Sequence, residues 1–218
     1  MLTFALLVSA CRPRSHLTPH YLPGIVAGSE HIFRKVRIAI RSTEYQFGSS
    51  RIEVGKIYAA DGSVEASLSI VDASGLFTRM LIEALTDAGL DPVAIDSKKP
   101  PTGVDFMLSS TLEQIAVNKR WGGDETVHGQ YFDMTASVRA KFELRNRRGE
   151  VLYSGEVTGI EKEPPAPVSN EVFLPLETEP VESLSVALSR AVGGLMLQPK
   201  FRAALLAAEV EPERNRSK

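Results

Sequence analysis

Cysteine is nearly absent from this sequence of 218 residues, which holds only Cys11. A single cysteine excludes a disulfide within the chain and a zinc site built from cysteine ligands. The signatures of common enzyme classes are missing as well. The sequence has no Gly-rich phosphate loop, no Gly-x-Ser-x-Gly elbow and no His-Glu-x-x-His motif. It therefore predicts a protein that is not an enzyme and that uses no metal or cofactor.

An excess of charge of either sign is also missing. Lys and Arg together number 25, Asp and Glu number 27, and the formal net charge is -2. Nucleic-acid-binding domains usually carry a basic patch, and the one short basic run here (Arg145, Arg147, Arg148) adjoins Gly149, as is typical of a solvated turn. We therefore expect no nucleic-acid partner. A hydrophobic fraction of 43% suffices for one compact domain.

The first eleven residues have a character of their own. Residues 2–10 are apolar or small, too short a run for a bilayer span of about 20 residues but suited to the core of a signal peptide. The run ends in Val8-Ser9-Ala10-Cys11, which resembles the lipobox of bacterial lipoproteins. The resemblance implies cleavage before Cys11, a diacylglycerol on its thiol and a further acyl chain such as palmitate on its amino group. Arg12 follows instead of Asp, which by the same resemblance implies the outer membrane, facing the periplasm.

The alternative is a buried N-terminal strand with Cys11 as a small core residue. Residues 12–23 favour the lipoprotein, because three prolines and little periodicity are typical of a tether. We therefore predict a signal peptide over 1–10, a lipidated cysteine and flexible tether over 11–34, one domain over 35–208 and a disordered tail over 209–218.

Strict alternation of apolar and polar residues predicts long strands. Over residues 131–145 every even position is apolar, which gives one buried and one wet face. Residues 146–149 form a turn, and 150–160 return as the hairpin partner. Residues 104–119 read as another strand whose inward parity switches, which predicts a bulge near Glu113 and Gln114. Shorter strands are expected over 35–41, 51–58, 64–70 and 92–96.

Apolar stripes at helical spacing predict two amphipathic helices. The first is capped by Asp72 or Ser74 and stops at Gly89, and the second follows Pro180. A further short helix is expected over 201–208. The elements together predict an α+β fold, a mostly antiparallel sheet with two amphipathic helices packed on one face.

The order of these features extends the lipobox resemblance. A first strand is followed by a helix ending in Ala-Leu-Thr-Asp-Ala-Gly-Leu (84–90), a hairpin containing Gly-Glu-Val-Leu-Tyr-Ser-Gly (149–155) and a last helix over 181–195. This order resembles the YajG-like outer-membrane lipoproteins and, more loosely, the auxiliary lipoproteins of envelope ABC transporters. The resemblance covers roughly residues 35–206. It implies a location and no known reaction, and only Cys11 carries over as a functional residue.

One loop between the long strands collects residues suited to binding. It contains Trp121, Asp124, Glu125 and His128. One interpretation is a partner-binding tip with Trp121 as its anchor, because Trp is enriched at interface hot spots. In the alternative, Trp121 folds back over the sheet edge and the carboxylates are solvated.

These patterns predict a membrane-anchored, non-catalytic accessory lipoprotein of the bacterial cell envelope. It would bind an envelope protein partner and could form a homo-oligomer. His16 and His20 lie four apart, but in a proline-broken segment, so no metal site is expected there. The alternative function is a transporter-auxiliary lipoprotein that binds a lipid or small amphiphile, which requires an apolar pocket between helix and sheet.

Overall fold

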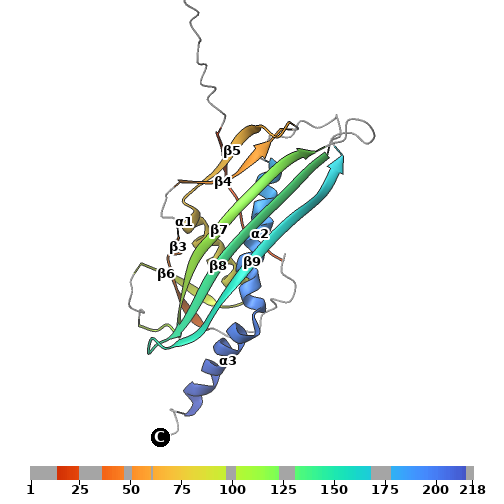
Figure 1. Ribbon diagram of the computed structural model, residues 1–218. Helices are drawn as coiled ribbons and strands as arrows, with labels where there is room; N and C mark the ends of the chain where they lie inside the picture. Colours follow the sequence, from red (N-terminus) through yellow and green to blue (C-terminus); the bar gives the residue numbers. More distant parts are fainter. Residues whose placement is uncertain are drawn as a thin grey trace, which may run out of the picture.

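The computed structural model describes residues 14–24, 36–46, 51–59, 61–96, 102–122, 131–167 and 178–214. Over these residues the chain forms one nine-stranded sheet and three helices (Figure 1). The elements in chain order are β1 (Arg14–Leu17), β2 (Arg37–Arg41), β3 (Glu44–Tyr45), β4 (Arg51–Tyr58), β5 (Val64–Val71), α1 (Ala73–Asp87), β6 (Asp91–Ile95), β7 (Phe106–Gly122), β8 (Tyr131–Asn146), β9 (Val151–Pro167), α2 (Thr178–Leu197) and α3 (Pro199–Arg214).

Strand β7 organises the sheet, because its two edges are used differently. Along one edge it pairs with β8 over its whole length, and β8 pairs in turn with β9. The other edge is divided among three shorter strands, β2, β3 and β4. Strand β6 extends the sheet beyond β2, whereas β5 and β1 extend it beyond β4.

The prediction of a mostly antiparallel sheet is wrong, because the sheet is mixed. Strands β2, β3 and β4 run parallel to β7, β6 runs parallel to β2, and β1 runs parallel to β5. Only the hairpins β4–β5, β7–β8 and β8–β9 are antiparallel. Alternation in a sequence shows which face of a strand is buried, but a partner of either direction satisfies it equally well.

The predicted faces of the long strands are confirmed. The even positions of β8 from Met134 to Leu144 are all buried, and its odd positions are not. In β7 the pairing with β8 shifts register between Leu112 and Gln114, so the bulge lies at Glu113, where it was predicted. The extra residue moves the buried parity from Leu112 to Ile115, and both side chains reach the core.

Helix α1 begins at the predicted cap. The carboxylate of Asp72 accepts a hydrogen bond from the backbone N–H of Gly75 at 3.0 Å. Asp72 has a φ of 53°, a left-handed conformation that Asp tolerates better than most residues. The helix ends at Asp87, and Gly89, with a φ of 85°, turns the chain into β6.

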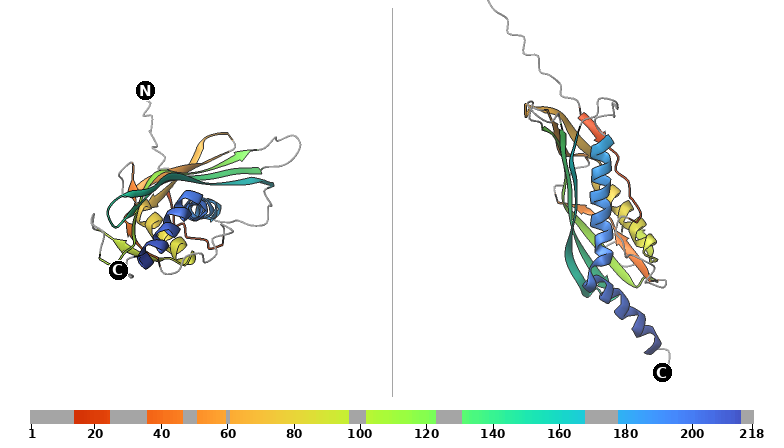
Figure 2. Two further views of the ribbon diagram at one scale, coloured as in Figure 1. Left: turned by 90° about the horizontal axis from the view of Figure 1, so that it is seen from below. Right: turned by 90° about the vertical axis from the view of Figure 1, so that its right-hand side faces the viewer.

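The helices lie together on one side of the sheet (Figure 2). Helix α2 crosses β9, β8 and β7, and α1 packs beside it. Helix α3 continues past one end of the sheet and is held there by Phe201 and Leu205, of which Phe201 meets the Tyr153 ring edge to face at 5.3 Å. The helix runs to Arg214, so it enters the segment 209–218 that was predicted as a disordered tail.

The segment predicted as a flexible tether also differs from expectation. Residues Arg14–Leu17 form β1 and extend the sheet beside β5. Along residues 14–19 exposed and buried positions alternate, with Ser15, Leu17 and Pro19 facing inward. Two of these three buried residues are a serine and a proline, so hydrophobic periodicity could not reveal the strand.

Candidate functional site

Most of the sequence-predicted site residues lie outside the part of the chain that the structure describes. This holds for Cys11, Asp124, Glu125 and His128. The backbone of Trp121 is described, near the end of β7, where it pairs with Phe132 of β8. The candidate site is therefore built from the segment that follows Cys11 and from the end of the sheet where that segment begins.

The segment after Cys11 is tied to helix α2 by two serines. The backbone N–H of His20 donates to the hydroxyl of Ser185 at 3.1 Å, and the N–H of Leu22 donates to the hydroxyl of Ser189 at 2.9 Å. Both serines are buried, and Ser185 also donates to the carbonyl of Val181. The sequence analysis missed these residues, because their partners His20 and Leu22 lie more than 160 residues away along the chain.

Tyr21 connects the same segment to helix α1. Burial is the main reason why the pKa of Tyr21 is raised from 10.0 to about 12, and the nearby carboxylate of Asp87, which shares a hydrogen bond with the phenol, adds to the rise. Glu83 contributes a smaller electrostatic effect in the same direction. The segment therefore bridges both helices and belongs to the folded body.

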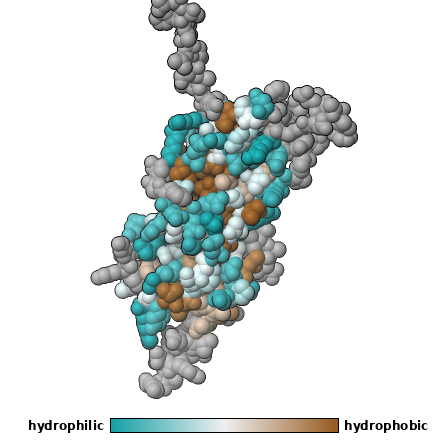
Figure 3. Space-filling view, in the orientation of Figure 1, coloured by the Kyte–Doolittle hydropathy of each residue, from teal (hydrophilic) through white to brown (hydrophobic). Residues whose placement is uncertain are grey.

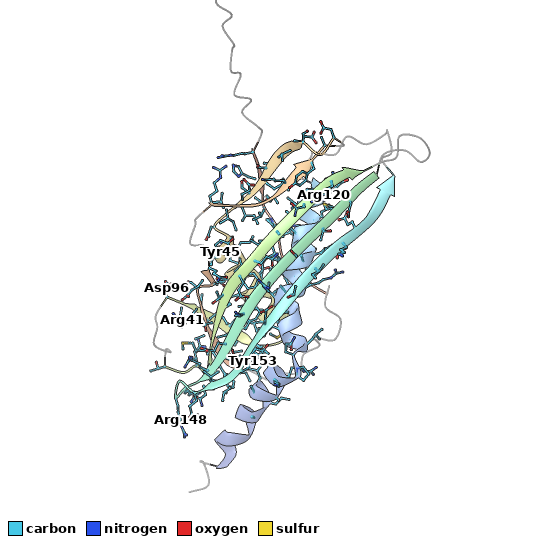
Figure 4. The ribbon with its side chains drawn as sticks, in the orientation of Figure 1. Arg41, Tyr45, Asp96, Arg120, Arg148 and Tyr153 are labelled. Atoms are coloured by element: carbon cyan, nitrogen blue, oxygen red, sulfur yellow. The ribbon has the colours of Figure 1, made fainter. Side chains whose placement is uncertain are left out.

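Strand β1 begins near one end of the molecule, which we call the anchor end. At this end Tyr58 of β4 pairs with Arg120 of β7, and Asp61, Gly62 and Ser63 form the turn between β4 and β5. The guanidinium of Arg120 lies over the Tyr58 ring, 5.2 Å from its centroid. Figure 4 shows Arg120 at this end and Arg148, in the β8–β9 turn, at the opposite end.

A buried ion pair lies just beneath the anchor end. The ammonium of Lys119 on β7 contacts the carboxylate of Glu179 in the first turn of α2, and the Lys119 side chain is only 6% exposed. Nearby, the hydroxyl of Ser183 on α2 donates to the carboxylate of Glu163 on β9. These contacts hold the start of α2 against the ends of β7 and β9.

A serine and a histidine meet on the β1–β5 pair. The Ser69 hydroxyl lies 2.9 Å from Nδ1 of His16, and Nη2 of Arg51 lies 2.5 Å from Nε2 and 3.4 Å from Nδ1 of the same ring. The Ser69 hydroxyl also donates to the Ser15 carbonyl at 3.4 Å. These contacts join β1 to β5 and to β4.

The described residues hold no candidate metal site and no candidate membrane span. No three His, Cys, Asp or Glu side chains in them come together in a way that could hold a metal ion. In the same part of the chain, no helix is long and apolar enough to cross a membrane.

The outer face of the three long strands is mostly hydrophilic (Figure 3). Glu113 on β7 pairs with Lys141 and with Arg139 of β8, and Arg139 also reaches Glu156 of β9. The apolar exceptions lie on β9, where Leu152 is 40% and Ile160 47% exposed. Strand β9 pairs only with β8 among the described strands, and at Ile160 the guanidinium of Arg190 on α2 donates to the backbone carbonyl.

Comparison with known proteins gives no family. No family model and no curated protein matches the chain. A Xanthomonas campestris protein of the family DUF330 aligns with 94% of this chain and 100% of its own, at 11% identity and a TM-score of 0.45. A Helicobacter pylori protein described as a neuraminyllactose-binding hemagglutinin homologue aligns with 89% of this chain and 99% of its own, at 8% identity and a TM-score of 0.46. Lipoprotein GNA1162 from Neisseria meningitidis aligns over 58% of this chain and 83% of its own, at 15% identity and a TM-score of 0.32. Similarity at these scores establishes neither a shared fold nor a shared function.

Proposed function

We propose that this chain is a non-catalytic accessory lipoprotein of the bacterial cell envelope, of the YajG-like kind. A lipid on Cys11 holds it in the outer membrane, facing the periplasm, where it binds an envelope protein complex. The observation that carries the proposal is the short distance in sequence between the lipobox-like motif and the first strand of the sheet. Val8-Ser9-Ala10-Cys11 has the lipobox pattern, and the sheet begins directly after it, at Arg14. A lipid at that position would attach the folded body to a membrane, and several acyl chains hold firmly, at about 0.8 kcal/mol per buried methylene.

Among the described residues, the contact between Ser69 and His16 has a structural role. It joins β1 to β5, and Arg51 of β4 contacts the same imidazole ring. We assign this contact no chemical step.

The outer face of β9 is the partner surface that the described residues support best. Leu152 and Ile160 expose apolar side chains on this face, at the side of the sheet where β9 pairs with no further described strand. The predicted residues Trp121, Asp124, Glu125 and His128 remain a second proposed contact.

The test is a crosslinked pull-down from native membranes that compares the wild type with Cys11→Ser. We expect the wild type in the membrane fraction together with a defined envelope complex, and the variant released without it. The double variant Cys11→Ser/Asp61→Cys is the matched control, because it restores a thiol outside the lipobox and should stay released. A Cys11→Ser protein that remains membrane-bound with the same complex would refute the proposal.

The partner surface is tested separately with Ile160→Lys. This variant should remain in the membrane and lose the crosslinked partner, whereas Lys162→Ala, an exposed position on the same strand, should keep it. Retention of the partner by Ile160→Lys would exclude the outer face of β9 and leave the anchor unaffected.

The structure counts against the alternative function, a carrier of a lipid or small amphiphile in a pocket between α2 and the sheet. A Cβ added at Gly159 of β9 would lie 1.9 Å from the carbonyl oxygen of Ala187, so helix and strand are in backbone contact there. The apolar residues of α2 around this contact are fully buried. These are Leu184, Ala187, Leu188, Ala191, Val192 and Leu195.

A further inference from the structure

The pairing of β1 with β5 fixes how far Arg14 lies from the anchor end, measured along the strands. Arg14 pairs with Ser67 of β5, and Ser67 lies opposite Lys56 of β4. Strand β5 begins at Val64, so about 10 Å of strand lies between Ser67 and the anchor end, at a rise of roughly 3.3 Å per residue. Strand β7, which runs parallel to β4, continues past this level to Gly122.

The connection between Cys11 and the first strand of the sheet is short. Only residues 12 and 13 separate Cys11 from Arg14. Since an extended residue spans at most roughly 3.3–3.6 Å, the Cα of Cys11 lies within about 10 Å of the Cα of Arg14. Cys11 can therefore reach about as far as the tip of β5 and no farther.

The short connection cannot be lengthened without unfolding part of the body. Peeling β1 from β5 would expose Leu17, which is 3% exposed in the fold. Continuing would break the bonds of His20 and Leu22 to Ser185 and Ser189. The folded chain thus keeps its first strand at a fixed distance from Cys11.

The surface at the anchor end is suited to a polar lipid layer. Asp61, Gly62 and Ser63 are exposed, and the Arg120 guanidinium lies over the Tyr58 ring. Tyrosine and arginine both combine an apolar body with a polar tip, and Tyr is enriched at membrane–water interfaces. The large apolar side chains exposed in the described residues lie elsewhere, so the described part of this end suits the polar headgroups.

We propose that the anchor end lies on the headgroup layer of the bilayer that holds the Cys11 lipid. The β8–β9 turn and α3, at the opposite end of the molecule, then point away from the membrane (Figure 2). The inference rests on the proposed lipidation of Cys11 and adds an orientation to it. A partner bound along β9 would reach the protein from the side, parallel to the bilayer.

The test uses the single native cysteine. A lipidated Cys11 has a thioether sulfur that does not react with maleimide, so a fluorescent maleimide marks only a thiol added at Asp61→Cys or at Arg148→Cys. Each lipidated protein is reconstituted in phosphatidylcholine vesicles with and without a spin-labelled headgroup quencher. We expect strong quenching of the label at position 61 and little at position 148. Equal quenching at both positions, or stronger quenching at 148, would overturn the orientation.

Two controls separate the orientation from the anchor. Wild-type protein from membranes should not react with the maleimide, and a reaction would show that Cys11 carries no lipid, whatever the orientation. A flexible Gly/Ser insertion of about 20 residues after Arg12 adds roughly 25 Å of reach. It should reduce quenching at position 61 to the level at 148, and unchanged quenching would show that the short connection does not hold this end on the membrane.

Discussion

The hydroxyl of Ser189 accepts a hydrogen bond from the backbone N–H of Leu22 at 2.9 Å. One helical turn earlier, Ser185 accepts from His20. Two residues of extended chain advance about 6.6 Å and four residues of helix rise about 6 Å, so the two spacings match. The extended segment therefore lies along α2, and each serine hydroxyl lies beside a backbone N–H. This match of spacings joins the segment that contains His20 and Leu22 to the folded body.

Replacing Ser189 with Ala should destabilise the fold. The N–H of Leu22 would lose its acceptor in a partly buried place, at a cost of about 1–2 kcal/mol in the free energy of unfolding. Urea unfolding measures the change, and Ser154→Ala, an exposed serine on β9, is the control. Equal losses in both variants would show that the Ser189 contact does not hold the segment.

Gly159→Ala should be more costly. The added Cβ would lie 1.9 Å from the oxygen of Ala187 and 2.7 Å from the nitrogen of Ala191, and neither backbone atom can move without shifting α2. Overpacking of this kind costs about 1–3 kcal/mol, and we expect a value at the upper end. In thermal unfolding, Gly159→Ala should have a clearly lower Tm than the control variant Thr158→Ala, which changes an exposed neighbouring residue. A Tm equal to that of the control would contradict the close approach of α2 and β9.

Glu179→Gln should destabilise the end of the sheet. The variant removes the negative charge that faces the buried ammonium of Lys119. Breaking a fully buried pair costs about 3–5 kcal/mol, and because the Glu179 side chain is 32% exposed we expect roughly 1–3 kcal/mol. Glu182→Gln, on an exposed position of the same helix, is the matched control. If Lys119→Met in the Glu179→Gln background recovers no stability, the buried charge is not the cause.

Tyr21 should make the fold sensitive to alkali. Its folded pKa of about 12 lies above the ordinary 10.0, so the folded state favours the neutral phenol. This contribution to stability is fully present below pH 10 and is lost as the pH rises towards 12, because the unfolded chain gives up its proton first. Tyr21→Phe should flatten the decline in unfolding free energy over this window. Tyr45 and Tyr153, whose pKa values burial also raises, remain in both proteins, so the difference between the two curves isolates Tyr21. Parallel curves would contradict the prediction.

Local sequence patterns predicted much of the fold. The alternation in β8 predicted its buried face, and the parity switch in β7 predicted the bulge at Glu113. Asp72 and Gly89 indicated the two ends of α1. Each of these depends on neighbours within a few residues, where the periods of strand and helix and the preferences of capping residues act directly. The lipobox-like pattern Val8-Ser9-Ala10-Cys11 is also local, and its lipidation stays a prediction.

The direction of strand pairing was decided only in the folded chain. A parallel and an antiparallel neighbour bury the same face, so alternation could not distinguish β2 beside β7 from a hairpin partner. The first strand was hidden for another reason, because only four residues form it and one of its two buried positions is Ser15. The residues that follow it, His20 and Leu22, have their acceptors Ser185 and Ser189 more than 160 residues away along the chain. The sequence by itself thus determined most of the elements and the faces of the long strands, and it contains the pattern on which the proposal of lipid attachment rests. Contacts between distant residues decided that the chain after Cys11 is part of the sheet, because hydrogen bonds to a helix at the far end of the chain leave no local pattern.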